Sequence, residues 1–215
     1  MEWERARTDE QKEQRVAEIV AATERLYEKY SFEEITFVMI AEEANFTRSN
    51  LYKYFSSKEE IFLEFVKNDI KLYVKNLVKE FSKDKNYSVE QFVSIWVKIL
   101  VKHKRLLNLI GILFAFLEKN CSVESLTDFK FATKDELMST VELICLIFPE
   151  ISPEKAKDFF YLQFASAVGL YQMTDLSEVQ KIVMENPELK DFKIDFEPYY
   201  KDAVEHLIKG LLNSK

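Results

Sequence analysis

The chain has 215 residues and a formal net charge of -7, with only three glycines and four prolines. So few turn-forming residues exclude a sheet protein with many hairpins, and the abundance of Leu, Lys, Glu, Phe and Ile favours helices throughout. The shortage of glycine also argues against a phosphate-binding loop.

The first half of the chain predicts four helices. Apolar side chains recur at i, i+3, i+4 and i+7 along the first and fourth, as an amphipathic helix requires. Thr36 and Thr47 are placed to cap the second and third helices, and Asn45 suits a left-handed turn between them. Ser57 and Glu60 have the spacing of a capping box that opens the fourth. The predicted ranges are 8–30, 37–44, 47–55 and 57–81.

A polar break at residues 83–86 is a candidate domain boundary, and more helices are predicted beyond it. Ser88 and Gln91 form a second capping-box pattern. Ser152 is followed by a proline and an acidic residue, which is a strong start signal for a helix. A loop is expected from Pro187 to Pro198. The predicted helices are 88–103, 106–119, 122–148 with a candidate interruption near Lys130, 152–173, 177–185 and 199–212.

Nothing in the sequence predicts a membrane span, an export signal or a disulfide. The longest apolar run, Leu106 to Leu117, is shorter than the roughly 20 residues a spanning helix needs. Cys121 and Cys145 lack metal-ligand spacing, and we interpret them as buried free thiols. These features predict a soluble cytoplasmic protein with no membrane partner.

The most informative stretch is residues 36–58, which predicts two short helices joined by a tight turn. No acidic residue lies between Ala44 and Lys58, although residues 1–58 together carry nine basic and twelve acidic side chains, a net of -3. A helix-turn-helix of this kind can place its second helix in the major groove of DNA. That helix needs an apolar inner face, supplied here by Leu51 and Phe55, and hydrogen-bond donors outside.

These residues resemble the TetR family of bacterial transcriptional regulators over roughly residues 12–66. The resemblance rests on four short motifs at the family's spacing. They are Ile40-Ala41, Ala44-Asn45-Phe46-Thr47, Leu51-Tyr52-x-Tyr54-Phe55 and Ser57-Lys58-Glu59. The fold it implies is all-α, with a helix-turn-helix DNA-binding domain at residues 8–66 (motif about 36–55). A larger helical effector-binding and dimerisation domain would follow at residues 67–215.

The resemblance also implies which side chains meet DNA. Arginine suits the O6/N7 edge of guanine, and asparagine pairs with adenine. The positions that match base-reading ones are Arg48, Ser49, Asn50 and, with either role, Lys53. Those that match phosphate-binding ones are Thr36, Thr47, Tyr52, Tyr54 and Lys58.

An effector pocket between the middle helices is implied by the same resemblance. Its candidate lining is rich in aromatic side chains, although helical spacing of aromatics is equally typical of plain core packing. The candidates are Trp96, Leu100, His103, Leu107, Ile110, Phe114, Met138, Phe160 and Phe164. No nearby cysteine or carboxylate gives either histidine a set of metal ligands, so no metal and no cofactor are expected.

Small residues between Phe164 and Gly169 would let another helix approach closely, and with the last helix they suggest a four-helix interface in a twofold dimer. Tight packing within one subunit is the alternative. The candidate interface residues are Phe164, Ala165, Val168, Tyr171, Val204, Leu207, Ile208 and Leu211.

The favoured hypothesis is a homodimeric DNA-binding repressor of a palindromic operator, released by a small apolar or aromatic effector. The alternative is a helical ligand-binding or protein-interaction module that no longer binds DNA, which the acidic balance of residues 1–58 supports. An enzyme ranks last, because the sequence holds no nucleophile elbow, phosphate loop or zinc signature.

Overall fold

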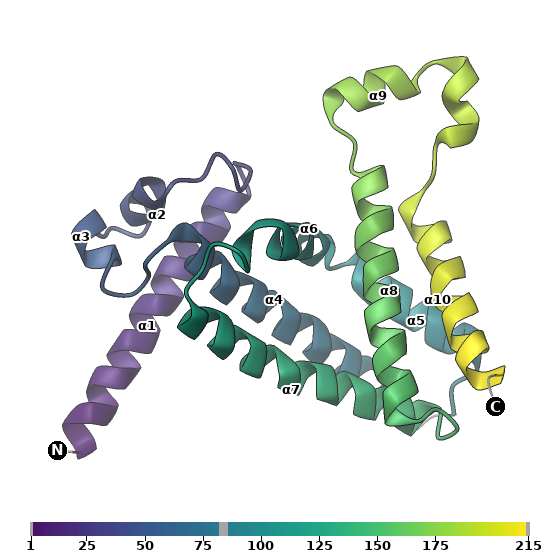
Figure 1. Ribbon diagram of the computed structural model, residues 1–215, viewed down its shortest axis with the longest axis horizontal. Coiled ribbons are helices and arrows are strands. Elements are labelled where there is room, and N and C mark those ends of the chain that lie inside the picture. Colours follow the sequence, from purple (N-terminus) through teal and green to yellow (C-terminus); the bar gives the residue numbers. More distant parts are fainter. Residues whose placement is uncertain (1, 82–85, 214–215) are drawn as a thin grey trace. The chain divides into compact units, whose positions relative to one another are not determined.

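The computed structural model describes residues 2–81 and 86–213, and every regular element in them is helical (Figure 1). The expected all-α fold is therefore confirmed. The elements are α1 Glu2–Tyr27, α2 Phe37–Glu43, α3 Arg48–Leu51, α4 Lys58–Phe81, α5 Val89–Val101, α6 Lys104–Ile112, the π-helix η1 Leu113–Leu117, α7 Val123–Ile147, α8 Pro153–Thr174, α9 Glu178–Met184, the 3-10 helix η2 Pro187–Phe192 and α10 Phe196–Asn213.

The chain forms two compact units, and each is built from two separate stretches. The first unit comprises Met1–Asn68 and Leu113–Lys130, and the second comprises Asp69–Ile112 and Phe131–Lys215. Two of the boundaries fall inside the long helices α4 and α7, and the third falls where α6 meets η1. The break expected at residues 83–86 lies outside the described residues except for Asn86.

The first unit has an aromatic core built by α1, the α1–α2 connection and the first half of α4. Tyr27 meets Phe62 and Phe65 edge to face at centroid distances of 5.6 and 5.7 Å. Phe32 meets Phe62 in the same way at 5.0 Å. Edge-to-face contacts of this kind add to the burial of large apolar surfaces, so this cluster stabilises the unit around the start of α4.

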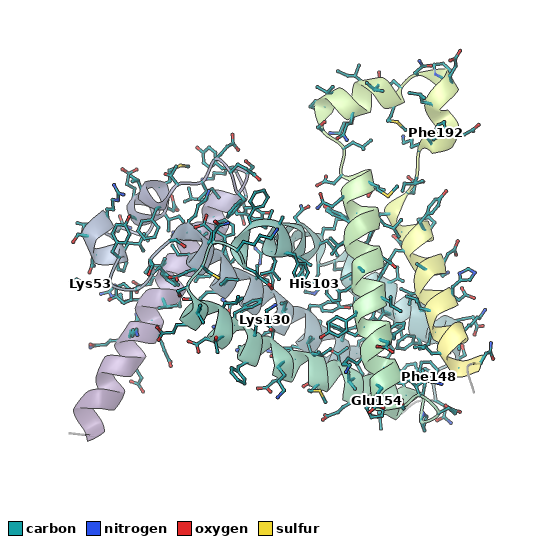
Figure 2. All side chains as sticks on the ribbon, viewed as in Figure 1. Lys53, His103, Lys130, Phe148, Glu154 and Phe192 are labelled. Atoms are coloured by element: carbon teal, nitrogen blue, oxygen red, sulfur yellow. The ribbon has the colours of Figure 1, made fainter. Side chains whose placement is uncertain are left out.

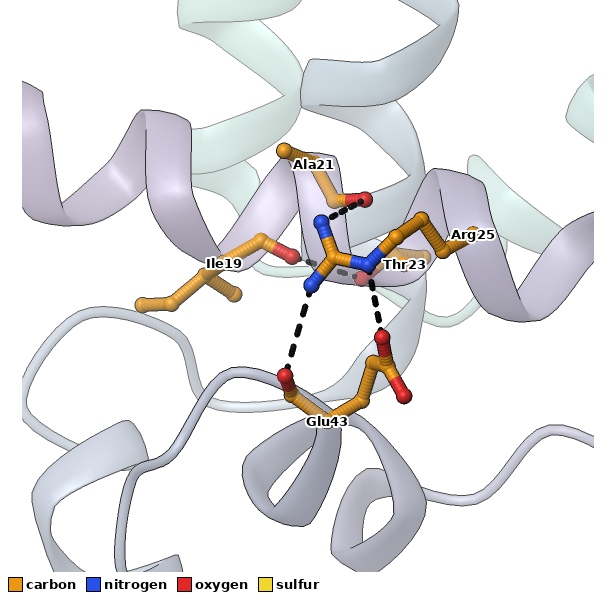
Figure 3. Close-up of polar contacts among 5 residues, drawn as sticks. All are labelled: Ile19, Ala21, Thr23, Arg25 and Glu43. Atoms are coloured by element: carbon orange, nitrogen blue, oxygen red, sulfur yellow. Dashed lines mark hydrogen bonds and ion pairs between the residues drawn. The ribbon is translucent and has the colours of Figure 1, made fainter.

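An ion pair attaches α2 to α1. The Arg25 guanidinium donates from Nε to Glu43 Oε1 at 2.6 Å and from Nη2 to the Glu43 carbonyl at 3.3 Å (Figure 3). Its third bond, from Nη1, reaches the carbonyl of Ala21 within α1 at 3.3 Å. One side chain thus binds both the carboxylate and the backbone at the C-terminal end of α2, which fixes that end against α1.

The second unit is organised around a buried polar triad. Trp96 of α5 donates from Nε1 to Gln163 Oε1 at 3.2 Å and to the Tyr200 hydroxyl at 3.1 Å, and that hydroxyl donates to Gln163 Oε1 at 2.5 Å. The three residues come from α5, α8 and α10, and α10 packs along both of the other helices. Because each polar atom has a partner, the triad ties three apolar helices together without an unsatisfied group.

The helix starts predicted at Ser88 and Ser152 are confirmed. Ser88 forms the expected capping box with Gln91, and Ser152 caps α8 by accepting from the Lys155 amide. The Ser57 capping box is only half formed. Ser57 Oγ accepts from the Glu60 amide at 3.4 Å, but the Glu60 carboxylate accepts from the amides of Ser56 and Ser122 instead.

Three expectations about the later elements are wrong. The helix expected over residues 106–119 begins at Lys104 and changes to the π-helix η1 after Ile112. No interruption occurs near Lys130, because α7 is continuous from Val123 to Ile147. The loop expected before Pro198 contains η2 and the first turn of α10, where Pro198 is tolerated because early helical amides need no acceptor.

Gln163→Leu should lower the stability of the folded chain. The substitution removes the shared acceptor of Trp96 Nε1 and Tyr200 Oη in a buried site, at an expected cost of about 1–3 kcal/mol. Thermal unfolding measures it, with the exposed Gln172→Leu on the same helix as the control. Equal melting temperatures for the two variants would show that the triad adds nothing to the packing.

Candidate nucleic-acid interface

The turn between α2 and α3 has the geometry of a helix-turn-helix. Thr36 Oγ1 accepts from the Met39 amide and Thr47 Oγ1 from the Asn50 amide, each at 3.2 Å, so both predicted caps are confirmed. Asn45 between them adopts a φ of 58°, the left-handed conformation expected of it. The Phe46 amide then closes the turn on the Ala41 carbonyl at 2.8 Å.

The second helix of the motif is shorter than predicted. Regular α-helix covers only Arg48–Leu51, and residues 52–54 continue as turns in which the amides of Lys53 and Tyr54 bond three residues back. Leu51 and Phe55 are buried, as their assignment to the inner face requires. Lys53 lies on the exposed side of this short segment (Figure 2).

Arg48 is oriented by Tyr52, which lies one turn further on. Its Nη2 donates to the Tyr52 hydroxyl at 3.2 Å, and its guanidinium lies 5.6 Å from the centroid of the same ring. The Tyr52 ring in turn packs on Phe37 of α2 at 4.6 Å. Arg48 and Tyr52 are both exposed, so the chain Phe37–Tyr52–Arg48 presents a cation on the outer face in a restricted position.

The Lys58 ammonium is engaged within the fold. Nζ donates to the carbonyls of Phe32 and Ile35 at 2.7 and 2.8 Å, and it lies 4.3 Å from the Phe32 ring centroid. Two of its three N–H donors are therefore bonded to the connection between α1 and α2. The half-buried side chain fastens that connection to the first residue of α4.

The remaining predicted DNA-contact residues line the same segment. Thr36, Thr47 and Ser49 are exposed, and Asn50 and Tyr54 are half-buried. Each capping threonine uses an oxygen lone pair on a backbone amide and keeps its own O–H as a donor. The Tyr54 ring packs against Phe46 edge to face at 6.0 Å. The site therefore offers hydroxyl, amide and cationic donors on one short stretch.

Sequence reasoning missed the role of Glu60 in supporting this site. Its buried carboxylate accepts from the Ser56 amide at 2.8 Å and from the Ser122 amide at 3.2 Å. Burial alone would raise the pKa of Glu60, but these bonds lower it below its usual value, so the carboxylate is ionised. Ser122 lies 62 residues away in sequence, and no local pattern could have indicated this contact.

The predicted effector residues do not share one environment. Trp96, Leu100 and Leu107 are fully buried, and Trp96 belongs to the polar triad. Phe160 and Phe164 are half-buried neighbours on α8, with centroids 5.1 Å apart. Met138 is 41% exposed. The other three differ again: Ile110 is buried, His103 is half-buried, and Phe114 is 60% exposed and belongs to the first unit.

The predicted dimer residues fall into two groups. Val204 and Ile208 are 0% exposed, because they pack inside the second unit, and they have no surface left for a partner. This part of the prediction is corrected: the apolar stripe of α10 faces the chain's own α5 and α8. Ala165 is exposed, and the others are half-buried. Those half-buried residues are Phe164, Val168, Tyr171, Leu207 and Leu211.

Several other features of the described residues bear on the site. No group of three or more potential metal ligands occurs among them. Within the same ranges, no helix is long and apolar enough to cross a bilayer. Cys121 and Cys145 are free thiols, as expected, although both are half-buried rather than fully buried.

Family models match nearly the whole of this architecture. A model described as "Bacterial regulatory proteins, tetR family" matches residues 19–65, and one described as "Tetracyclin repressor-like, C-terminal domain" matches residues 67–215. The chain therefore belongs to the TetR family of transcriptional regulators, and the resemblance inferred from the sequence is confirmed.

Two curated relatives are themselves described only as uncharacterized HTH-type transcriptional regulators. The one from Haemophilus influenzae is 25% identical over 135 residues, which is 60% of this chain and 64% of the relative. YfiR of Bacillus subtilis is 36% identical over 63 residues, which is 29% of this chain and 31% of YfiR. The matches thus span less than two thirds of either relative's length.

Two solved structures share the fold. The fatty acid degradation regulator FadR from Bacillus halodurans superposes with a TM-score of 0.58 at 18% identity, covering 92% of this chain and 96% of that one. SmeT, the repressor of a Stenotrophomonas maltophilia multidrug efflux pump, gives 0.52 at 16% identity and covers 91% and 89%. At these identities the likeness concerns architecture alone.

Lys58→Met should lower the melting temperature of the chain. Methionine keeps the apolar stem but leaves the Phe32 and Ile35 carbonyls without their charged donor, at an expected cost of about 1.5–3 kcal/mol. Thermal unfolding in the absence of DNA is the measurement. The exposed Lys53→Met is the matched control and should melt close to the unchanged chain. A destabilised Lys53→Met beside an unaffected Lys58→Met would reverse this assignment.

Proposed function

We propose that this chain is a dimeric repressor that reads a palindromic operator through α2 and α3 and leaves it when a small apolar or aromatic molecule binds the second unit. The observation that carries the proposal is the exposed Arg48–Tyr52 pair on a capped helix-turn-helix. Membership of the TetR family supports the general part of this proposal, namely a transcriptional regulator with a DNA-binding and a ligand-binding part.

In this proposal, Arg48, Ser49 and Asn50 face base edges in the major groove. Arg48 suits guanine and Asn50 suits adenine. Exposed Lys53 reaches either a base or a phosphate, while Thr36, Thr47, Tyr52 and Tyr54 supply hydroxyl donors to phosphates. Lys58 acts first as the support of the α1–α2 connection, and its third N–H remains for a phosphate.

The acidic balance of residues 1–58 does not oppose this role, because the acidic side chains are spread unevenly along the segment and some of them are held in ion pairs away from the α2–α3 motif's basic stretch. Arg25 pairs with Glu43, and Arg15 pairs with Glu18 at 2.6 Å. The segment from Ala44 to Lys58 then presents Arg48 and Lys53 with no carboxylate of its own. Phosphate attraction acts over about one Debye length, roughly 8–10 Å in physiological salt, so the local charge matters more than the total.

We place the dimer interface on the outer face of α8. Its exposed apolar and small residues between positions 161 and 173 form a helical stripe with a spacing of about one turn, and two of them are small enough to allow close approach. The stripe comprises Tyr161, Leu162, Ala165, Gly169 and Met173. Twofold pairing would let two reading helices meet half-sites about 34–36 Å apart, and effector binding would act by changing that separation.

The competing proposal, a ligand-binding module that has lost DNA binding, makes the opposite prediction in a single experiment. A palindromic site from the promoter region of the chain's own gene is titrated at several salt concentrations. DNA binding through phosphates requires log K to fall linearly with log salt. A chain that retains no fragment in dilute buffer would support the module instead. We propose no catalytic role and a cytoplasmic location, where operator DNA is accessible.

Arg48→Ala should weaken operator binding by about 1–3 kcal/mol and relax the preference at the base pair it contacts. The loss is sequence-dependent because a bidentate pairing to one base disappears. Gel-shift titrations on the operator and on single-base variants measure it. Lys71→Ala, which removes an exposed charge from the second unit, is the control. A uniform loss over all sequences would assign Arg48 to a phosphate.

Ala165→Arg should convert the dimer to a monomer. The substitution puts a bulky charge at an exposed small position on α8, where a partner helix would otherwise approach closely. Analytical ultracentrifugation at fixed protein concentration measures the mass. Ser139→Arg, at an exposed position of α7, adds the same single charge as the control and should remain dimeric. A dimeric Ala165→Arg variant would move the interface away from this face.

A further inference from the structure

Tyr73 of α4 carries a polar atom that the fold does not use. Its side chain is 1% exposed, and its hydroxyl has no hydrogen-bond partner among the described residues. The other fully buried tyrosine, Tyr200, has its hydroxyl bonded twice in the polar triad. A buried hydroxyl without a partner has lost its hydrogen bonds to water and gained none in return, so such atoms are rare in folded proteins.

The surroundings of Tyr73 are aromatic. Its ring meets His103 edge to face at 5.5 Å and Phe164 at 5.9 Å, and Phe160 lies 5.1 Å beyond Phe164. His103, in the turn between α5 and α6, is labelled in Figure 2. Tyr73, His103 and Phe164 belong to the second unit and come from three different elements, which here form an aromatic site.

Several polar groups on the elements around Tyr73 already have partners. Asn76 Nδ2 lies 3.0 Å from His103 Nε2, so these two groups are paired with each other. Gln163 Oε1 accepts from both Trp96 and Tyr200. An acceptor for the Tyr73 hydroxyl must therefore come from outside this set.

The site is electrically neutral. Burial raises the pKa of Tyr73 far above its usual range, with the nearby Tyr200 adding to the effect, so the phenol keeps its proton. Burial lowers the pKa of His103, although Asp69 acts in the opposite direction. The lowered pKa favours the neutral ring. Asp69 is itself held by Arg105 through two bonds of 2.6 and 2.9 Å.

We propose that the Tyr73 hydroxyl is the polar anchor of the effector site, donating a hydrogen bond to a carbonyl or ether oxygen of an uncharged aromatic ligand seated against His103 and Phe164. This inference rests on the proposed function, because it names the ligand class of the effector-binding unit. An anionic ligand is disfavoured, because the Arg105 guanidinium beside the site is already paired with Asp69 and a buried carboxylate would lack a counter-charge.

The first test needs no ligand. Tyr73→Phe removes a hydroxyl with no partner, so its melting temperature should equal or exceed that of the unchanged chain. Tyr200→Phe is the matched control, since it removes a hydroxyl that is bonded twice, and it should melt lower. A Tyr73→Phe variant that is destabilised as much as Tyr200→Phe would overturn the proposal, because the hydroxyl would then already be satisfied.

The second test measures binding of three naphthalene probes by calorimetry, without DNA. The ketone 2-acetylnaphthalene carries a neutral acceptor, 2-ethylnaphthalene has nearly the same shape without one, and 2-naphthoate is the anion. The ketone should bind best, and Tyr73→Phe should weaken it about tenfold while leaving the hydrocarbon unchanged, as loss of one hydrogen bond requires.

Three outcomes would overturn the proposal: tighter binding of the anion, an equal loss for ketone and hydrocarbon, or no binding of any probe to the unchanged chain. Operator binding is measured separately by gel shift. A chain that ignored DNA but bound the ketone through Tyr73 would refute the repressor and leave the anchor standing. The reverse result would refute the anchor alone.

Discussion

The Lys58 ammonium is the contact on which the DNA-reading segment depends. It joins the first residue of α4 to two carbonyls of the α1–α2 connection, and it also lies over the Phe32 ring. The Arg25–Glu43 pair fixes the other end of α2. With both ends of α2 held, the left-handed Asn45 determines where α3 begins. A four-residue helix could not hold this position by itself, because isolated short helices are unstable in water.

The same contacts explain how an acidic chain can present a cationic surface. Cations near the core donate hydrogen bonds to backbone carbonyls. The carboxylates of Glu43 and Glu60 accept hydrogen bonds from an arginine and from a backbone amide. What remains on the outer face is a small set of donors around Arg48, itself restrained by Tyr52. Restraint of this kind lowers the entropy lost when a side chain docks, so affinity does not require a large basic patch.

The sequence predicted several features that depend on neighbours three or four residues apart. The caps at Thr36, Thr47, Ser88 and Ser152 are all formed, because a capping hydroxyl needs only its own first turn. Partners distant in sequence were beyond it. The apolar stripe of α10 predicted a buried face but not that α5 and α8 cover it. Whether the Tyr73 hydroxyl finds a hydrogen-bond partner likewise depends on residues of other elements. The base and phosphate roles stay predictions, since exposure alone does not assign them.

The compact units and the family models divide the chain at different residues, and this difference affects the choice of a truncated fragment. The family boundary falls after residue 65, yet Leu113–Lys130 belongs to the first unit. Phe116 of that stretch packs on Phe32 at 6.1 Å, and the Ser122 amide binds Glu60. A fragment ending at residue 66 would therefore uncover an aromatic ring and strip a buried carboxylate of one donor. An independently folding DNA-binding unit would need both of its stretches, residues 1–68 and 113–130, joined by a linker in place of the helices between them.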